Sequence, residues 1–401
     1  MFDCGGMDFS EADFRASVAI VRSEDSTALS TAAIACHKLY PTGPMLRPYP
    51  LWGLGGNAMT KRTFALICFV CLGTLGAVAL PSHRLVSTPA DVRELNVTIQ
   101  EWAVPTKGAH PHDPAVGADG ALWFTEQMVN KLGRLDPKTG EFKEYPLATD
   151  KNSGPHGLVA DKEGNIWFTA NFGGYIGKLD PRTGKVTEYK MPVEKADDPH
   201  TAVFDGHGIL WFTVQGGNMV GRLDPKTGKI ELKEVPTEAA LPYGIQINSK
   251  GAPVFCELGT NKMASIDPQT LTIKEYPLPE GVRPRRLAIA ADDTVYFTDF
   301  KSGHLGTLNT STGSVKLFNS PGGAESNPYG IAITPDGIVW YSESGVHPNT
   351  IVQFNPKTQT FASAKIPSGG GVVRNMAATS DGRVYIACSG VDKVGVVSPA
   401  K

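Results

Sequence analysis

The chain has 401 residues, of which 41% are hydrophobic, and a formal net charge of −2. This balance provides no basic field of the kind that binds nucleic acid or anionic lipid, so we expect neither partner. Four of the six cysteines precede residue 72, and only Cys256 and Cys388 follow, which excludes a disulfide scaffold or a CxxC metal site in the rest of the chain.

An export signal is predicted near the N-terminus. Met59 is followed by Lys and Arg, then by the uncharged run "TFALICFVCLGTLGAVAL", which ends in Ala77-x-Ala79. This order is typical of a secretory signal peptide, so we expect one over residues 59–79, with cleavage after Ala79 and a periplasmic or secreted product. An uncleaved anchor is the alternative, because the run is near the lower limit for crossing a bilayer.

The segments that flank this signal are interpreted separately. Residues 1–58 show no periodicity, and a signal peptide belongs at a chain start. We therefore interpret residues 1–58 as an upstream extension from a misassigned start site, with Met59 as the initiator. Residues 80–96 are expected to form a linker, and no membrane contact is expected once the signal is removed.

The rest of the chain repeats itself. The second aromatic residue of "WFT" and its equivalents recur every 42 to 45 residues, at Phe124, Phe168, Phe212, Phe255, Phe297, Tyr341 and Ile386. Each unit contains four short apolar or alternating runs, such as "PHGLVAD", "IWFTA", "YIGKLD" and "KVTEYKM", separated by turns that contain Gly or Pro. Four antiparallel strands per unit of this length are typical of a β-propeller blade.

We therefore predict an all-β, seven-bladed β-propeller over residues 97–401. The seventh unit lacks a fourth strand, whereas "VTIQEWAVP" (97–105) precedes the first unit and aligns with the fourth strand of other units. The N-terminal strand is thus expected to complete the last blade, which would remove the open edge. We expect a monomer.

One residue per unit is predicted to line the mouth of the central channel. The residue after the Pro that opens each first strand (Val in the last unit) is His112, His156, His200, Tyr243, Arg285, Tyr329 or Arg374. We expect these side chains to bind a small ligand, and the arginines and tyrosines suit an anion. His112 or His156 is the candidate catalytic base, and the other five residues are candidate ligand-binding groups.

A second set ends the second strands and is expected to face the same mouth. Its carboxylates, Glu126, Glu257, Asp299 and Glu343, are candidate ligands for a hard cation such as Mg²⁺ or Ca²⁺. The three histidines are also a candidate half-site for a metal, with His110, Asp113 and Glu126 nearby. Alternatively, the acids form ion pairs with Arg285 and Arg374. No organic cofactor is expected.

The repeated motifs resemble those of a known family. "PHGLVADKEGNIWFT", "GRLDPKTG" and "EYPLP", behind a signal peptide, resemble the streptogramin (virginiamycin B) lyases over about residues 97–401. The resemblance implies a seven-bladed propeller with Mg²⁺ at one face. It also implies opening of a cyclic depsipeptide ester by elimination, in which a base takes the α-proton, the metal stabilises the enolate and the carboxylate leaves.

The residues that carry this chemistry in the family differ here. The family places His in the penultimate blade, and Glu-x-His and a further Glu in the last blade. The matching positions here are Tyr329, Val372, Arg374 and Cys388, and no other blade supplies the full set. We therefore predict that opening of streptogramin B is absent or feeble.

Three functions follow as hypotheses. The chain is a lyase-like metalloenzyme acting on an ester or lactone, an exported propeller that binds a small molecule, peptide or glycan without catalysis, or a calcium-dependent lactonase of the gluconolactonase type. The sequence does not decide between an enzyme and a binding protein.

Overall fold

The computed structural model describes residues 83–86, 92–147 and 152–400, all within one compact unit, Ala79–Lys401. The predicted extension (1–58) and signal peptide (59–79) lie outside the described residues. Among the residues described, no helix is both long and apolar enough to cross a bilayer.

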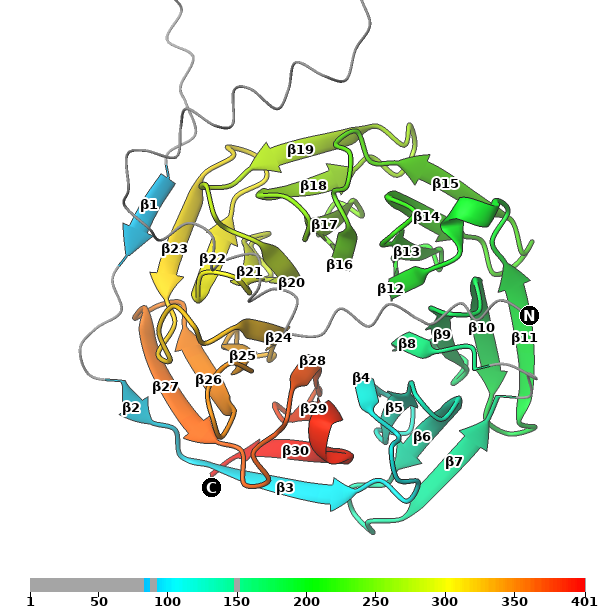
Figure 1. The fold of residues 1–401 in the computed structure, drawn as a ribbon, viewed down its shortest axis with the longest axis horizontal. Helices are drawn as coiled ribbons and strands as arrows, with labels where there is room; N and C mark the ends of the chain where they lie inside the picture. The colour runs from blue at the N-terminus through cyan, green and yellow to red at the C-terminus, as the bar shows by residue number, and fades with distance from the viewer. Residues whose placement is uncertain (1–82, 87–91, 148–151, 401) are drawn as a thin grey trace, which may run out of the picture. The chain divides into compact units, whose positions relative to one another are not determined.

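The described strands form seven sheets arranged as blades around a central axis, which confirms the predicted propeller (Figure 1). In each blade the first strand lies nearest the axis. From the axis outward, blade 1 contains β4 (Pro111–Val116), β5 (Leu122–Glu126), β6 (Lys131–Leu135) and β7 (Phe142–Pro146), and blade 2 contains β8 (Pro155–Ala160), β9 (Ile166–Ala170), β10 (Tyr175–Asp180) and β11 (Lys185–Lys190). Blade 3 contains β12 (Pro199–Phe204), β13 (Leu210–Val214), β14 (Met219–Leu223) and β15 (Ile230–Glu234). Blade 4 contains β16 (Pro242–Ile247), β17 (Pro253–Glu257), β18 (Lys262–Ile266) and β19 (Ile273–Pro277).

Blades 5 to 7 follow the same order. Blade 5 contains β20 (Pro284–Ile289), β21 (Val295–Asp299), β22 (His304–Leu308) and β23 (Val315–Asn319). Blade 6 contains β24 (Pro328–Ile333), β25 (Val339–Glu343), β26 (Thr350–Asn355) and β27 (Thr360–Lys365). Blade 7 contains β28 (Val373–Ala378), β29 (Val384–Cys388), β30 (Lys393–Pro399) and β3 (Val97–Ala103). Two short 3-10 helices, η3 (Glu194–Ala196) and η4 (Ser389–Val391), interrupt the connections.

The N-terminal strand closes the ring as predicted. β3 pairs antiparallel with β30 along its whole length, from Val97 opposite Pro399 to Ala103 opposite Lys393 (Figure 1). This pairing occupies the edge that β30 would otherwise expose.

Two further strands come from the stretch that was expected to be a linker. β1 (His83–Val86) pairs in parallel with β23, and β2 (Arg93–Glu94) pairs in parallel with β27. Blades 5 and 6 therefore have five strands each.

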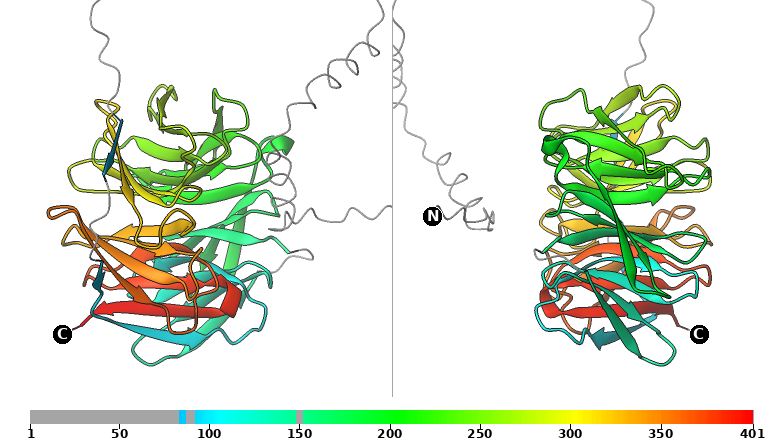
Figure 2. Two further views of the ribbon diagram at one scale, coloured as in Figure 1. Left: turned by 60° about the vertical axis from the view of Figure 1, so that its left-hand side comes forward. Right: turned by 90° about the vertical axis from the view of Figure 1, so that its right-hand side faces the viewer.

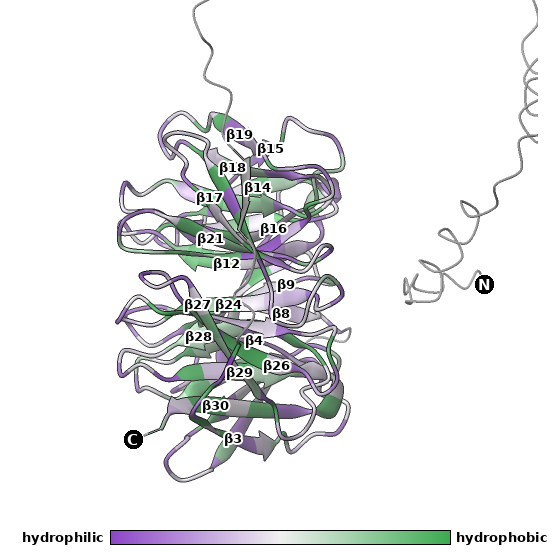
Figure 3. Ribbon diagram, turned by 90° about the vertical axis from the view of Figure 1, so that its left-hand side faces the viewer, coloured by the Kyte–Doolittle hydropathy of each residue, from purple (hydrophilic) through white to green (hydrophobic). Residues whose placement is uncertain are grey.

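A Phe–Gly pair on the second and third strands shows how closely a phenylalanine ring packs on the backbone within a blade. In blade 2, Phe168 on β9 lies opposite Gly177 on β10, and a Cβ on this glycine would lie 2.1 Å from Cζ of the ring. Blades 1, 3 and 5 have equivalent pairs. The rings are fully buried, and hydrophobic segments follow the strands within the blades (Figure 3).

The connections leave the ring on two opposite faces (Figure 2). On one face lie turns such as Asp136–Gly140, where the Asp136 carboxylate accepts a hydrogen bond from the Lys138 N–H (2.9 Å) and Gly140 has a φ of 76°. On the other face each first strand begins and each second strand ends, so the predicted site residues belong to that face.

Candidate ligand-binding site at the channel mouth

A β-bulge at the start of every innermost strand shapes the mouth. In blade 1, Pro111 pairs with Glu126 and the register then shifts before Pro114, which leaves His112 and Asp113 outside the regular ladder. The same shift occurs in the other six blades. Each blade therefore contributes two residues to the axis, and the first of each pair is a residue predicted to line the mouth.

The Thr of "WFT" links each bulge to the next blade. Thr125 accepts a hydrogen bond from the Asp113 N–H (3.0 Å) and donates one to the His156 carbonyl (2.9 Å). Thr169, Thr213 and Thr298 make equivalent links in three other blades. Ser342 of blade 6 makes a similar link, but it donates to the carbonyl of Val373, one residue before Arg374. Buried hydroxyl groups thus fix the backbone of the mouth, a role that the sequence pattern did not indicate.

The first layer of the mouth begins with a row of stacked rings. The centroids of His112 and His156, of His156 and His200, and of His200 and Tyr243 are each 3.9 Å apart. All four residues are buried. Burial, together with neighbouring positive charge, lowers the pKa of all three histidines well below its ordinary value, so the imidazoles are neutral at pH 7.

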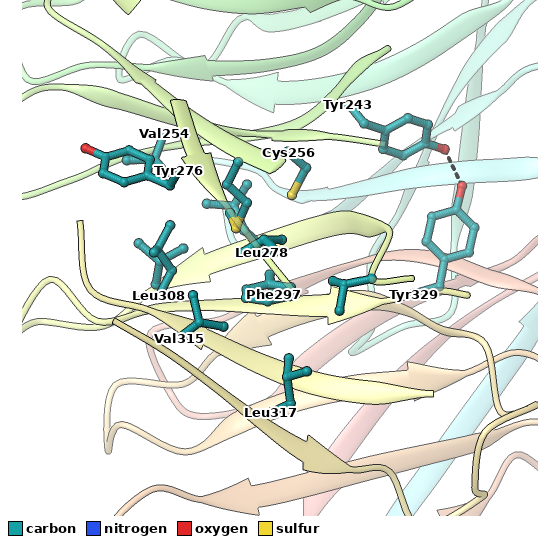
Figure 4. Close-up of a cluster of buried hydrophobic side chains, with 14 residues drawn as sticks. Tyr243, Val254, Cys256, Tyr276, Leu278, Phe297, Leu308, Val315, Leu317 and Tyr329 are labelled. Carbon is teal, nitrogen blue, oxygen red and sulfur yellow. Dashed lines mark hydrogen bonds between the residues drawn. The ribbon is translucent and has the colours of Figure 1, made fainter. Parts of the chain in front are cut away.

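The first layer continues with two phenols and an arginine. The hydroxyl groups of Tyr243 and Tyr329 form a hydrogen bond (Figure 4). The guanidinium of Arg285 lies 3.8 Å from the ring centroid of Tyr329 and 4.1 Å from that of Phe300, and it donates a 3.4 Å hydrogen bond to the Tyr243 hydroxyl. The structure therefore brings the predicted residues of neighbouring blades into contact.

A second layer crosses the axis beneath the first. Arg286 of blade 5 donates hydrogen bonds to Asp113 of blade 1 (2.8 Å) and to Thr201 of blade 3 (3.3 Å). Asn375 of blade 7 also donates to Asp113 (3.1 Å). Asp113 and Arg286 are buried, and beyond them a cavity of about 430 Å³ follows the axis between the inner strands. We call these four residues the axial layer.

The sequence carries a signal for the axial layer in a second column of the repeat. The residue one position after the predicted ring residue is polar in four blades and Gly in three. In blade 2 a Cβ on Gly157 would lie 2.4 Å from the His200 carbonyl oxygen, so the backbones approach too closely for a side chain. Comparing this second column between the units would have identified Asp113 and Arg286.

Among the described residues, the four candidate carboxylates form no cluster of three ligand atoms that could hold a metal ion. Asp299 accepts a hydrogen bond from the Arg283 N–H (2.9 Å). It also accepts one from His304 (2.8 Å), which lies on the next strand of the same blade. Glu343 accepts hydrogen bonds from Ser320, from the Gly322 N–H and from Thr350, each at 2.6 Å. Both carboxylates are buried and satisfied by their protein partners.

The other two carboxyls, Glu126 and Glu257, are buried and only weakly satisfied. Neither oxygen of Glu126 has a hydrogen-bond partner among the described residues, and Glu257 accepts one bond, from Thr260 (3.1 Å). Burial, and the nearby Glu144 carboxylate, raise the pKa of Glu126 to about 8. Burial and Glu275 raise the pKa of Glu257 to about 7.

The donor set does not fit the Mg²⁺ that the family resemblance implies. In the described part of the chain, the one group of three His, Cys, Asp or Glu ligand atoms within 4.8 Å of one another is His112, Asp113 and His156. Mg²⁺ prefers six oxygen ligands, whereas two of these donors are imidazoles. The Asp113 carboxylate is already bound by Arg286 and Asn375. We therefore derive no step through a metal.

Two arginines of the mouth have no acidic partner. Within the described residues, neither Arg285 nor Arg374 forms an ion pair, and the Nε atom of each is buried without a hydrogen-bond partner. The alternative hypothesis, in which the carboxylates pair with these arginines, is therefore wrong for the described carboxylates.

The fold and site together define a seven-bladed β-propeller with a His, Tyr and Arg mouth on its axis. Residues 91–344 and 255–400 match the sequence model of the virginiamycin B lyase family. The chain belongs to this family.

Solved structures of related proteins share the fold. A streptogramin B lyase superposes with a TM-score of 0.70 at 24% identity, over 76% of this chain and 98% of that chain. Virginiamycin B lyase from Staphylococcus aureus gives a TM-score of 0.69 at 23% identity, over 75% and 99% of the two chains. Kuenenia stuttgartiensis hydrazine synthase gives 0.62 at 15% identity, over 74% and 97%. At these identities the likeness establishes the fold alone.

Proposed function

We propose that the mouth binds a small anionic ligand through Arg285 and Arg374. The observation that carries this proposal is the pair of guanidinium groups without an acidic partner at the entrance. A guanidinium presents several N–H donors in one plane and binds a carboxylate with two parallel hydrogen bonds. The stacked histidines and the phenols beside these arginines offer further polar contacts and flat apolar surface.

Calorimetric titration with phenylacetate and its neutral analogue phenylacetamide tests this proposal. We expect phenylacetate to bind at least about tenfold more tightly, because charge-assisted hydrogen bonds are roughly twice as strong as neutral ones. Arg374→Gln should weaken phenylacetate binding by at least about tenfold. Arg383→Gln is the matched control, because Arg383 pairs with Asp381 in a turn away from the mouth. Equal affinity for both probes would refute the proposal.

A second candidate function is ester or lactone opening at the same mouth. Its support is the family membership and the hydrogen bond between His112 Nδ1 and Asp113 Oδ1 (2.9 Å), which leaves the lone pair of Nε2 on a neutral imidazole available to accept a proton. His112 and His156 are the candidate bases that the sequence indicates.

Quinupristin is the natural probe for this second function, because it is bound in the structure of a catalytically inactive S. aureus virginiamycin B lyase. We expect its linearisation by the present protein to be absent or slow, with or without Mg²⁺. Rapid opening, followed by chromatography, would show that the altered positions still support the lyase reaction.

A further inference from the structure

We propose that Met128 and Phe172 form an apolar rim of the mouth, which binds the hydrocarbon part of a ligand whose carboxylate is held by Arg285 and Arg374. The inference rests on the proposed function, because it assumes that this anion site exists. It narrows the ligand class to an amphipathic carboxylate with an extended hydrocarbon chain, such as a medium-chain fatty acid.

Large hydrophobic side chains are exposed on the face that carries the mouth. In the described part of the chain four such side chains are exposed, and three of them, Met128, Phe172 and Val193, lie in connections on this face. Met128 and Phe172 are the most exposed, at 55% and 57%. Both follow the end of a second strand, β5 or β9, directly beside the mouth residues of blades 1 and 2.

The repeat shows that these two side chains are particular to blades 1 and 2. They occupy the position four residues after the second aromatic residue of "WFT", which is Gly in four other blades and Lys301 in blade 5. In blades 4 and 6 a Cβ at this position would lie 2.0 Å from a carbonyl oxygen, so only glycine fits there. Lys301 is exposed and follows Phe300, whose ring Arg285 contacts. The edge of the mouth is therefore apolar at blades 1 and 2 and cationic at blade 5.

A backbone hydrogen bond fixes this position beside the mouth. The Met128 N–H donates to the Ala109 carbonyl (3.4 Å), and the Phe172 N–H donates to the Ser153 carbonyl (3.0 Å). Each acceptor lies three residues before the mouth histidine of its blade. The two apolar residues are therefore attached to the loops that lead into the stacked, neutral imidazoles.

Asn152 and Gly154 join the loops of blades 1 and 2. The side-chain amide of Asn152 donates to the Gln127 carbonyl (3.1 Å) and the Met128 carbonyl (3.4 Å), and its oxygen accepts from the Gly154 N–H (2.8 Å). The Phe172 ring lies on Gly154, since a Cβ on this glycine would lie 2.3 Å from Cδ2 of the ring. A single exposed hydrophobic residue needs no explanation, but two on joined loops form a surface that is ordered before a ligand arrives.

The rim and the arginines lie on different sides of one mouth. Arg374 is on β28, next to β4 of blade 1, and Arg285 is on β20, which faces β4 and β8 across the axis (Figure 1). A carboxylate bound by these guanidinium groups can therefore direct its chain over the imidazoles onto Met128 and Phe172. A short carboxylate ends before the rim, so affinity as a function of chain length reports whether the rim binds.

Calorimetric titration with butanoate and octanoate tests the inference. We expect wild type to bind octanoate at least about tenfold more tightly, because each fully buried methylene group adds about fourfold, and with a more negative heat-capacity change. Phe172→Ser and Met128→Ser should each lower the octanoate-to-butanoate affinity ratio by at least about threefold. Val92→Ser is the matched control and should keep the ratio, because this exposed residue precedes β2 at the outer edge of blade 6.

Arg374→Gln separates failure of this inference from failure of the proposed function. It should weaken both carboxylates and leave their affinity ratio within about twofold of wild type, because it removes a contact to the carboxylate alone. If butanoate and phenylacetate bind but octanoate gains nothing, or if the gain survives in both serine variants, the apolar rim is wrong and the anion site stands. If wild type binds none of the three carboxylates, the anion site is wrong and the apolar rim falls with it.

Discussion

Glu126 and Glu257 occupy nearly identical surroundings in blades 1 and 4. Each buried carboxyl lies near a lysine that donates hydrogen bonds to a glutamate and a threonine. In blade 1 these groups are Lys131, Glu144 and Thr106, and in blade 4 they are Lys262, Glu275 and Thr237. Because the lysine is already paired, its charge offsets the burial of the neighbouring carboxyl only in part. Such a carboxyl stays protonated in the folded chain at a pH where it is ionised in the unfolded chain.

This difference makes stability depend on pH. The folded pKa of Glu126, about 8, lies above the ordinary value of 4.5, so its stabilising effect is full below pH 4.5 and is lost as the pH rises toward 8. Glu126→Gln keeps a neutral group of similar shape and should therefore gain about 1–3 kcal/mol over wild type at about pH 9, but little at about pH 5. Urea unfolding at both pH values measures this, and exposed Glu163→Gln is the control. A pH-independent difference would contradict the assignment.

The buried ion pair of the axial layer should contribute more than a surface pair. Asp113→Asn leaves the Arg286 guanidinium buried without a counter-charge, and we expect a loss of about 3–5 kcal/mol in the free energy of unfolding. Asp119→Asn, which removes the half-exposed partner of Arg134, should cost less than about 1 kcal/mol. If urea unfolding gave equal losses of free energy for the two variants, the buried Asp113 pair would contribute no more to stability than the surface pair.

At this scale the sequence predicted some of the site and missed the rest. The ring from His112 to Arg374 followed from register within the repeat. The repeat did not predict that the side chains of Asp299 and Glu343 would bind partners in their own blade or in the preceding one. These contacts depend on hydroxyl and backbone donors of loops that vary in sequence. The contact between Asp113 and Arg286 joins blades 1 and 5 across the axis, and no local pattern encodes it.

Among the elements, the paired second and third strands of a blade have little tolerance for added volume. Gly177→Ala places a methyl group within the space of the Phe168 ring and should destabilise the protein by about 1–3 kcal/mol. Gly206→Ala is the matched control, because no atom lies within 4 Å of its added Cβ. Thermal unfolding of the two variants compares them, and equal melting temperatures would show that the ring shifts without cost.

The strands themselves were predictable because each carries an alternating or apolar pattern bounded by Gly or Pro turns. The bulges in the inner strands were not, since a shift of register requires knowing which residues face each other. β1 and β2 were also missed, because their parallel pairing with β23 and β27 depends on the edges that the folded ring provides rather than on a signal of their own.

For the whole molecule, closure by β3 is the feature most open to test. A chain that starts at Val104 lacks β3 and exposes the edge of β30, so we expect its melting temperature to fall by roughly 5 °C or more and its tendency to aggregate to increase. A chain that starts at Val92 keeps β3 and β2 and should stay close to the full-length protein. Calorimetry and light scattering measure both effects, and equal behaviour of the two chains would contradict the role of closure.

The arginine-rich mouth also predicts how the protein responds to metal removal. Because the positive groups at the mouth disfavour a cation there, EDTA should change neither the melting temperature nor phenylacetate binding. A loss of either on chelation, restored by Mg²⁺ or Ca²⁺, would show that the carboxylates or histidines do hold an ion.

The axial layer determines whether a ligand can pass along the central channel. Its hydrogen bonds join blades 1, 3, 5 and 7 across the axis, so the channel does not offer a through passage. A molecule that reaches the histidines and arginines must depart by the opening through which it arrived. Binding and release of a ligand therefore use the same opening, so a ligand already bound at the mouth blocks the entry of the next.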